Sequence, residues 1–121
     1  MREANGQTFD AIVREDDALV VAYFWGDDCP NCDVFKADLP ALLEKVPNGI
    51  RFVQVNAYVE MELARRFGLF GVPAFLLFHR GKLIGRMSEY YGRQYWLTVL
   101  EEQQKKALEK AAENPGDRQR A

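Results

Sequence analysis

Two cysteines, Cys29 and Cys32, are the residues of this chain best suited to chemistry, and the chain has no others. They stand in the stretch Cys-Pro-Asn-Cys, three residues after the continuously apolar run 18–25 and directly before a segment with helical periodicity. A Cys-x-x-Cys pair that ends a buried strand and opens a helix is typical of a redox-active dithiol in a cytosolic protein. The pair therefore predicts thiol–disulfide chemistry, positioned by a strand and a helix.

The length and composition are those of one globular domain. With 121 residues, 48% of them apolar and 28% charged, the chain is long enough to bury a core without staples. No apolar run approaches the roughly 20 residues that cross a bilayer, and residues 1–6 contain no apolar signal core. We therefore expect no membrane insertion and a cytoplasmic location, where thiols stay reduced and a cysteine pair is kept for its reactivity.

The charge pattern argues against nucleic acid as a partner. Lys plus Arg number 16 against 18 Asp plus Glu, a net charge of −2, and no segment is densely basic. The chain also has no Gly-rich phosphate loop, no Ser-His-Asp set and no paired-carboxylate arrangement. Its single histidine, His79, falls in a predicted hairpin turn, where we expect a solvated loop residue.

Hydrophobic periodicity predicts helices that alternate with short apolar strands, the pattern of an α/β protein with helices on both faces of a sheet. The uninterrupted run 18–25 predicts a central strand covered on both faces. Pro40 lies inside the second predicted helix, where we expect a kink or a restart near Leu39. The predicted elements are helix 7–15, strand 18–25, helix 30–46, strand 50–55, helix 56–67, strand 74–78, strand 83–87 and helix 93–113.

Two of these helices carry further expectations. Asn56 is the expected N-cap of the third helix, whose apolar stripe includes Val59. The last helix has an apolar stripe that thins along its length, so its first half should dock on the sheet and its second half project into water. Residues 1–113 are expected to form a single domain, followed by a disordered tail over 114–121.

The order of the elements, the motif Trp-x-x-x-Cys-Pro-x-Cys that begins at Trp25, and Gly71-Val72-Pro73 ahead of the hairpin together resemble the thioredoxin family. The resemblance covers about residues 7–106. It implies a thioredoxin-like fold: a central mixed sheet of about four strands, helices on both faces and a long C-terminal helix. Family members usually begin with an extra edge strand, and residues 1–6 are barely long enough to supply one, so that strand should be short or missing.

The position of the cysteines predicts different roles for them. Cys29 is the expected N-cap of its helix, with Pro30 at the first helical position. Free backbone N–H groups and the positive end of the helix dipole stabilise a thiolate there, so Cys29 is the predicted nucleophile. Cys32 lies one turn further in and is the predicted resolving thiol, which attacks the mixed disulfide. No metal is expected at the pair.

Nearby residues should tune the reactivity of Cys29. Three carboxylates lie within about a turn of Cys29, those of Asp27, Asp28 and Asp33. Their negative charge opposes the thiolate and offsets much of the effect of the helix end, so we expect only a modest lowering of the Cys29 pKa. Pro30 acts against these carboxylates, because the local geometry that it imposes favours the thiolate. The dipeptide that it forms with Asn31 resembles those of glutaredoxins and periplasmic oxidases, which would suggest a more oxidising protein.

Other matched positions depart from the family or complete its site. Thioredoxins usually bury an aspartate six residues before the first cysteine, with a lysine near it on the next strand. In this chain Tyr23 occupies the aspartate position and Gln54 the lysine position. Tyr23 is therefore either a hydrogen-bond partner for Cys32 or a core aromatic. The resemblance implies a cis Pro73 beside the sulfurs, so that the backbone of Val72 can pair with an extended substrate. Trp25 would flank the sulfurs, and Ser88-Glu89-Tyr90-Tyr91 would form a bulky acidic rim where thioredoxins commonly have a small glycine.

Three functions remain open from the sequence. The first is a thiol–disulfide oxidoreductase that reduces protein disulfides through the cysteine pair, needs no other cofactor, is recycled by a thiol-regenerating reductase and acts as a monomer. The second is a thioredoxin-fold adaptor with little redox activity. The third is a metal or iron–sulfur binding module, which would need ligands from outside the chain because a closed zinc site takes four.

Overall fold

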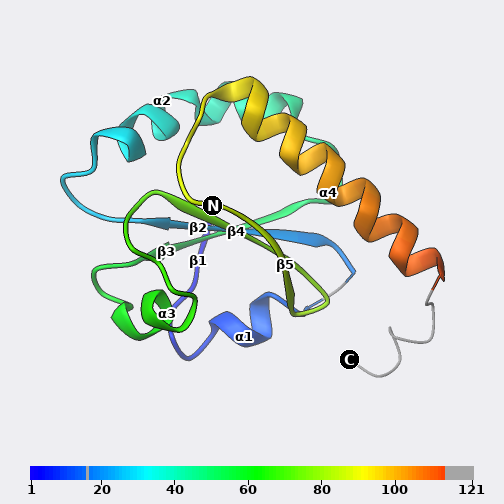
Figure 1. Cartoon of the computed structure of the whole chain (residues 1–121), viewed down its shortest axis with the longest axis horizontal. Helices are drawn as coiled ribbons and strands as arrows, with labels where there is room; N and C mark the ends of the chain where they lie inside the picture. The colour runs from blue at the N-terminus through cyan, green and yellow to red at the C-terminus, as the bar shows by residue number, and fades with distance from the viewer. Residues whose placement is uncertain (16, 114–121) are drawn as a thin grey trace.

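The computed structural model describes residues 1–15 and 17–113 (Figure 1). Residues 114–121, where the sequence predicts a disordered tail, lie outside the described part, and the domain boundary at 113 stays a prediction. The elements in chain order are β1 (Arg2–Glu3), α1 (Phe9–Ile12), β2 (Leu19–Trp25), α2 (Pro30–Lys45), β3 (Arg51–Asn56), α3 (Met61–Arg66), β4 (Ala74–His79), β5 (Lys82–Met87) and α4 (Arg93–Glu113).

The strands form one mixed sheet in the order β1-β3-β2-β4-β5. The neighbours β1, β3 and β2 run parallel, whereas β4 is antiparallel to β2 and β5 is antiparallel to β4. Helices α2 and α4 cover one face of the sheet, and α1 and α3 cover the other (Figure 1). This arrangement confirms the predicted α/β fold class, with helices on both faces and a long C-terminal helix. The short first strand is present as the two residues of β1, which makes a sheet of five strands.

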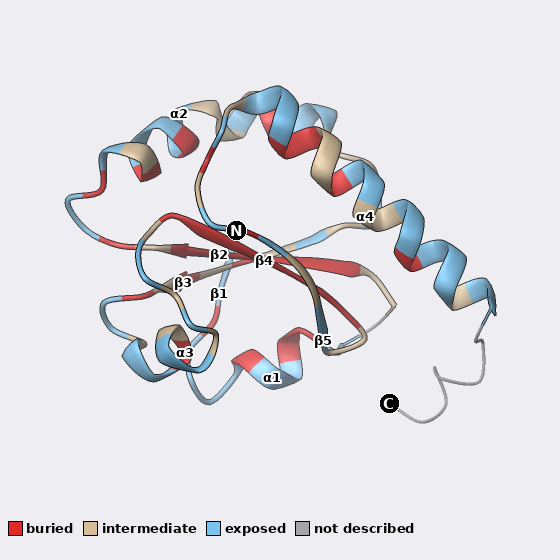
Figure 2. Cartoon of the chain, in the orientation of Figure 1, coloured by how far each residue is buried: buried red, intermediate tan, exposed pale blue. Residues whose placement is uncertain are grey.

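Strand β2 separates two hydrophobic cores, because its side chains alternate between the faces of the sheet. Val20, Ala22 and Phe24 belong to the core under α1 and α3, while Leu19, Val21 and Tyr23 belong to the core under α2 and α4. Strands β2 and β4 are accordingly buried along almost their whole length (Figure 2). The prediction that 18–25 forms a central strand covered on both faces is confirmed.

Helix α1 is shorter than the predicted 7–15, helix α2 excludes one of the two outcomes expected at Pro40, and helix α3 begins later than predicted. Helix α2 runs from Pro30 to Lys45 as one element with Pro40 inside it, so no restart occurs near Leu39. Helix α3 begins only at Met61, because the side chain of Asn56 accepts a hydrogen bond from the Tyr58 backbone N–H (3.0 Å) and forms a turn instead of capping a helix. The predicted helix start at Asn56 was therefore wrong.

His79 also differs from its prediction. It is the last residue of β4 and is only 5% exposed, whereas the turn pattern predicted a solvated residue. Burial and the positive charge of Arg80 lower the pKa of the imidazole from its usual value. The hairpin turn begins one residue later than the sequence suggested, so the histidine is drawn into the sheet.

Candidate active site

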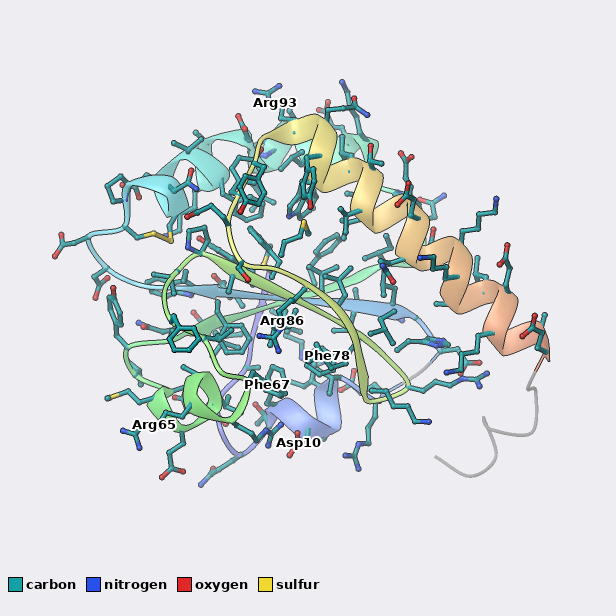
Figure 3. All side chains as sticks on the ribbon, viewed as in Figure 1. Asp10, Arg65, Phe67, Phe78, Arg86 and Arg93 are labelled. Carbon is teal, nitrogen blue, oxygen red and sulfur yellow. A yellow bond between two sulfur atoms is a disulfide. The ribbon has the colours of Figure 1, made fainter. Side chains whose placement is uncertain are left out.

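The two cysteines form a disulfide at the start of α2, drawn as a yellow bond in Figure 3. Their Cα atoms are 5.2 Å apart. Cys29 is the N-cap of the helix, with Pro30 directly after it, and the Cys29 Sγ accepts a hydrogen bond from the Cys32 backbone N–H (3.1 Å). Cys29 is 8% exposed and Cys32 only 1%, so Cys29 is the more accessible sulfur. The N-cap position expected for Cys29 is thus the one observed.

The loop before β4 meets the disulfide. The Val72–Pro73 peptide bond is cis, as the family resemblance implied, and the Val72 carbonyl oxygen lies 3.4 Å from the Cys29 Sγ. Because the sulfur carries no hydrogen in the disulfide, this is a contact rather than a hydrogen bond. The structure therefore brings together four residues that the sequence singled out: Cys29, Cys32, Val72 and Pro73.

The end of β2 and the loop that joins it to Cys29 hold Trp25, the tryptophan of the family motif. Trp25 ends β2 and is half-buried, and the Lys36 ammonium lies 4.7 Å from the centre of its ring, within cation–π range. Gly26 permits close approach of the Tyr58 ring, because a Cβ there would come within 2.6 Å of it. Asp28 has a φ of +53°, a left-handed conformation that aspartate tolerates better than most residues, and it turns the chain into α2.

The rim after β5 is tied to the dipeptide between the cysteines. The Asn31 amide nitrogen donates to the Glu89 carboxylate and to the Tyr90 carbonyl oxygen (3.2 Å). The Tyr90 backbone N–H donates to the same Glu89 oxygen (3.2 Å). The sequence predicted an acidic rim here but not its contact with Asn31, since the partners are 58 residues apart in the chain.

A second link joins the rim to α2. The Tyr90 hydroxyl donates to Asp38 (2.5 Å), and Arg93, at the start of α4, pairs with the other Asp38 oxygen (3.0 Å; Figure 3 labels Arg93). The hydrogen bonds from Tyr90 and Arg93 lower the pKa of Asp38. Burial, and then the bond to the Asp38 carboxylate, raise the pKa of the Tyr90 hydroxyl. The rim segment 88–92 is thus fastened to α2 at two points, Asn31 and Asp38.

Tyr23 lies in the core beneath α2. Its ring centre is 4.7 Å from that of Phe35 and 5.4 Å from that of Phe75, and the residue is 2% exposed. Within residues 1–15 and 17–113 its hydroxyl has no hydrogen-bond partner. Burial and then the negative charge of Asp33 raise the pKa of Tyr23 to about 12, so the hydroxyl is neutral at physiological pH. Gln54, the other substituted family position, donates to the Met1 carbonyl oxygen instead (2.9 Å).

An apolar groove of about 220 Å³ adjoins Val72, and the sequence did not predict it. Its walls come from the turn after β3, from α3 and from the loop before β4, and they include Tyr58, Met61 and Phe70. These side chains are 57%, 53% and 106% exposed, the last being fully open to solvent. Exposed side chains from three segments give no periodic signal, so only the folded chain shows the groove beside the disulfide.

Two further features bear on function. Among the described residues, no group of three or more His, Cys, Asp and Glu side chains is arranged to hold a metal ion. In that same part of the chain no helix has the length and apolar character needed to cross a membrane.

The comparisons with known proteins agree with this geometry. The Thioredoxin family model matches residues 1–105. Thioredoxin 1 of Chlorobaculum tepidum is 31% identical over 82 residues, which cover 68% of this chain and 81% of that protein. Thioredoxin f2 of Chlamydomonas reinhardtii, a solved structure, superposes with a TM-score of 0.76 at 23% identity, over 86% of this chain and 96% of that one. A thioredoxin mutant from Halobacterium salinarum gives 0.74 at 22%, over 85% and 89%. The chain belongs to the thioredoxin family of thiol–disulfide oxidoreductases.

Proposed function

We propose that the protein reduces disulfides of other proteins, with Cys29 as the nucleophile and Cys32 as the resolving thiol. One observation carries the proposal: the Cys29 Sγ is both the N-cap acceptor of α2 and the sulfur next to the Val72 carbonyl. The first contact stabilises negative charge on that sulfur in the reduced protein. The second puts the same sulfur beside an exposed backbone edge on which a substrate segment can lie.

The cycle balances in two exchange steps. The Cys29 thiolate attacks one sulfur of the substrate disulfide, forms a mixed disulfide and releases the other substrate sulfur as a thiolate. Cys32 then loses its proton to water and attacks the Cys29 sulfur, which expels the second substrate thiolate. The substrate gains two electrons, and the protein is left with the Cys29–Cys32 disulfide seen in the structure.

The different surroundings of the two sulfurs support this division of roles. Cys32 is almost completely buried, so a large substrate cannot reach it first. It sits one turn after Cys29 and donates its backbone N–H to the Cys29 sulfur, which keeps it close to the mixed disulfide that it must attack. Pro30 supports the N-cap geometry, because it fixes the first helical residue and needs no hydrogen bond there.

Substrate binding is assigned to the surface around Val72 and Pro73. An extended segment pairs with the Val72 backbone, and its side chains reach the apolar groove that adjoins Val72. Trp25 is proposed as a further residue in contact with the substrate. We propose that Asp28, on the surface, and Tyr23, in the core beneath α2, tune the reactivity of the two cysteines. We further propose a cytoplasmic monomer that needs no cofactor beyond its own disulfide and is recycled by a thiol-regenerating reductase.

The test is trapping of the mixed disulfide. The Cys32→Ser variant, incubated with an oxidised protein substrate, should accumulate a covalent complex that migrates with the combined mass and disappears on adding dithiothreitol. Cys29→Ser should form none, and only the wild type should turn over in a disulfide-reduction assay. An adaptor would bind the partner equally in all three proteins, and an iron–sulfur module would show a visible absorption band. Either result would refute the proposal.

A further inference from the structure

We propose that Glu89 is a specificity-determining residue, which makes the protein prefer disulfides flanked by basic side chains over those flanked by acidic ones. The inference rests on the proposed function and names a substrate class for the same site. It starts from the contact between Glu89 and Asn31, the residue directly before Cys32. This contact places a carboxylate next to the cysteine pair from a segment far away in the chain.

The Glu89 carboxylate is fixed in place. It accepts hydrogen bonds from the Asn31 side chain and from the Tyr90 backbone, and it is half-buried. The rim that carries it is fastened to α2 a second time through Tyr90 and Asp38. A charge held by two donors loses little further conformational freedom when a partner binds, and partial burial shields it from screening by salt.

The other charged residues near the cysteine pair do not cancel the negative charge of Glu89. Asp27 and Asp28 precede Cys29, and Asp33 follows Cys32 in the first turn of α2. The cation closest to the motif along the chain is Lys36, whose ammonium lies over the Trp25 ring. Asp38 and Arg93, the other charged residues tied to the rim, form an ion pair with each other (3.0 Å) and add no net charge. Four carboxylates, with Glu89, thus stand against one ammonium around the motif, which is an excess of negative charge.

Glu89 differs from the three aspartates in how it is held. Asp27, Asp28 and Asp33 are exposed, and water and salt weaken the field of such groups. Glu89 accepts a hydrogen bond from Asn31, a residue of the motif itself, through its side chain. A Lys or Arg beside the substrate cysteine would meet this carboxylate as the sulfurs approach, and a Glu or Asp would be repelled.

The experiment uses two disulfide-bonded peptides that are identical except for Lys or Glu at the positions flanking the cysteine. The ratio of their kcat/KM values is measured for the wild type, for Glu89→Gln and for Glu109→Gln, a matched change at an exposed residue of α4. Gln keeps an acceptor oxygen for Asn31, and thermal unfolding checks that the fold is retained. Each ratio is divided by that for dithiothreitol, which removes the intrinsic reactivity of the peptides.

We expect the wild type to favour the Lys peptide. Glu89→Gln should lower kcat/KM for the Lys peptide about sixfold and raise it for the Glu peptide about sixfold, each being Coulomb's law for unit charges about 8 Å apart at an effective dielectric of about 40, so the preference should fall roughly 35-fold. Glu109→Gln should match the wild type. Raising the salt from about 0.01 to about 1 M shortens the screening length from about 30 to about 3 Å. It should remove the part of the preference that comes from the exposed aspartates and leave much of the difference between the wild type and Glu89→Gln, because Glu89 is half-buried.

Two results overturn the inference in distinguishable ways. If the wild type reduces both peptides and Glu89→Gln keeps the wild-type ratio, Glu89 does not determine specificity and the proposed function stands. If the wild type reduces neither peptide while dithiothreitol reduces both, the proposed function fails and the inference falls with it.

Discussion

Replacing Tyr23 with phenylalanine should stabilise the protein. The hydroxyl of Tyr23 is buried between aromatic rings and has no hydrogen-bond partner among the described residues. A buried polar group without a partner costs about 1–3 kcal/mol, because it has lost its hydrogen bonds to water. Phenylalanine keeps the ring contacts with Phe35 and Phe75 and removes only the hydroxyl.

We expect a gain of about 1 kcal/mol, the low end of that range, because the lost oxygen leaves a small void. For a chain of this length that corresponds to a rise of about 4 °C in the melting temperature. The gain should be constant between about pH 5 and 9. The pKa of Tyr23 is raised to about 12, so the same neutral hydroxyl is removed throughout that range.

Tyr90→Phe is the matched control, because Tyr90 is buried in the same core but its hydroxyl donates to Asp38 (2.5 Å). Losing a hydrogen bond to a charged acceptor should destabilise the protein, by about 1 kcal/mol or more. Urea unfolding of the oxidised proteins, followed by circular dichroism, measures both changes. A loss of stability in Tyr23→Phe, or the same sign in both variants, would refute the reasoning about unpaired hydroxyls.

The same variant tests the functional role of Tyr23. If the hydroxyl is the hydrogen-bond partner of Cys32 in the reduced protein, Tyr23→Phe should slow the release of the mixed disulfide while raising stability. If Tyr23 is only a core aromatic, the release rate should equal that of the wild type. Single-turnover kinetics with a trapped substrate separate these outcomes.

Three further predictions concern the sulfurs, the buried histidine and the groove. In the reduced protein Cys29 should be alkylated much faster than Cys32 near neutral pH, as mass spectrometry of the modified peptides would show; equal rates would contradict the assigned roles. Burial lowers the pKa of His79, so the stability that depends on its neutral form is present above about pH 6.5 and is lost as the pH falls below that value. In urea unfolding at several pH values, the free energy of unfolding of His79→Gln should fall less steeply with decreasing pH than that of the wild type. Phe70→Ser should change the free energy of unfolding by less than about 0.5 kcal/mol yet raise KM for protein disulfides, and an unchanged KM would remove the groove from the substrate site.

Much of the fold could be predicted because β2 and the cysteine pair carry strong local signals. A continuous apolar run has to be covered on both sides, and Cys-Pro after a strand marks a helix start. By contrast, β1 has two exposed residues and is held by backbone pairing to Val53 and Gln54, so no pattern of apolar side chains marks it. At Asn56 the same side chain can form a helix cap or a turn, and in the structure it accepts a hydrogen bond from the Tyr58 backbone N–H and forms the turn.

The candidate site divides in the same way. Cys29 and Cys32 are three positions apart in the sequence and their chemistry follows from that spacing, whereas the link from Asn31 to Glu89 joins two segments across the fold. Single-sequence patterns report which face of an element is buried, and they do not report which polar side chains meet. The groove around Phe70 could not be predicted for a related reason, since the sequence around an exposed loop aromatic is the same whether or not that residue lines a groove.

The division of the interior by β2 has a consequence for how sequence change acts on this protein. The cysteine helix rests on the core that contains Phe35, whereas the segment before Val72 packs on the other core through Phe67 and Leu69. Substitutions in cores without shared partners have nearly additive effects on stability, within about 0.5 kcal/mol. Natural or laboratory selection can therefore change the core that supports the groove beside Val72 with little effect on the stability of the core that supports the cysteine helix.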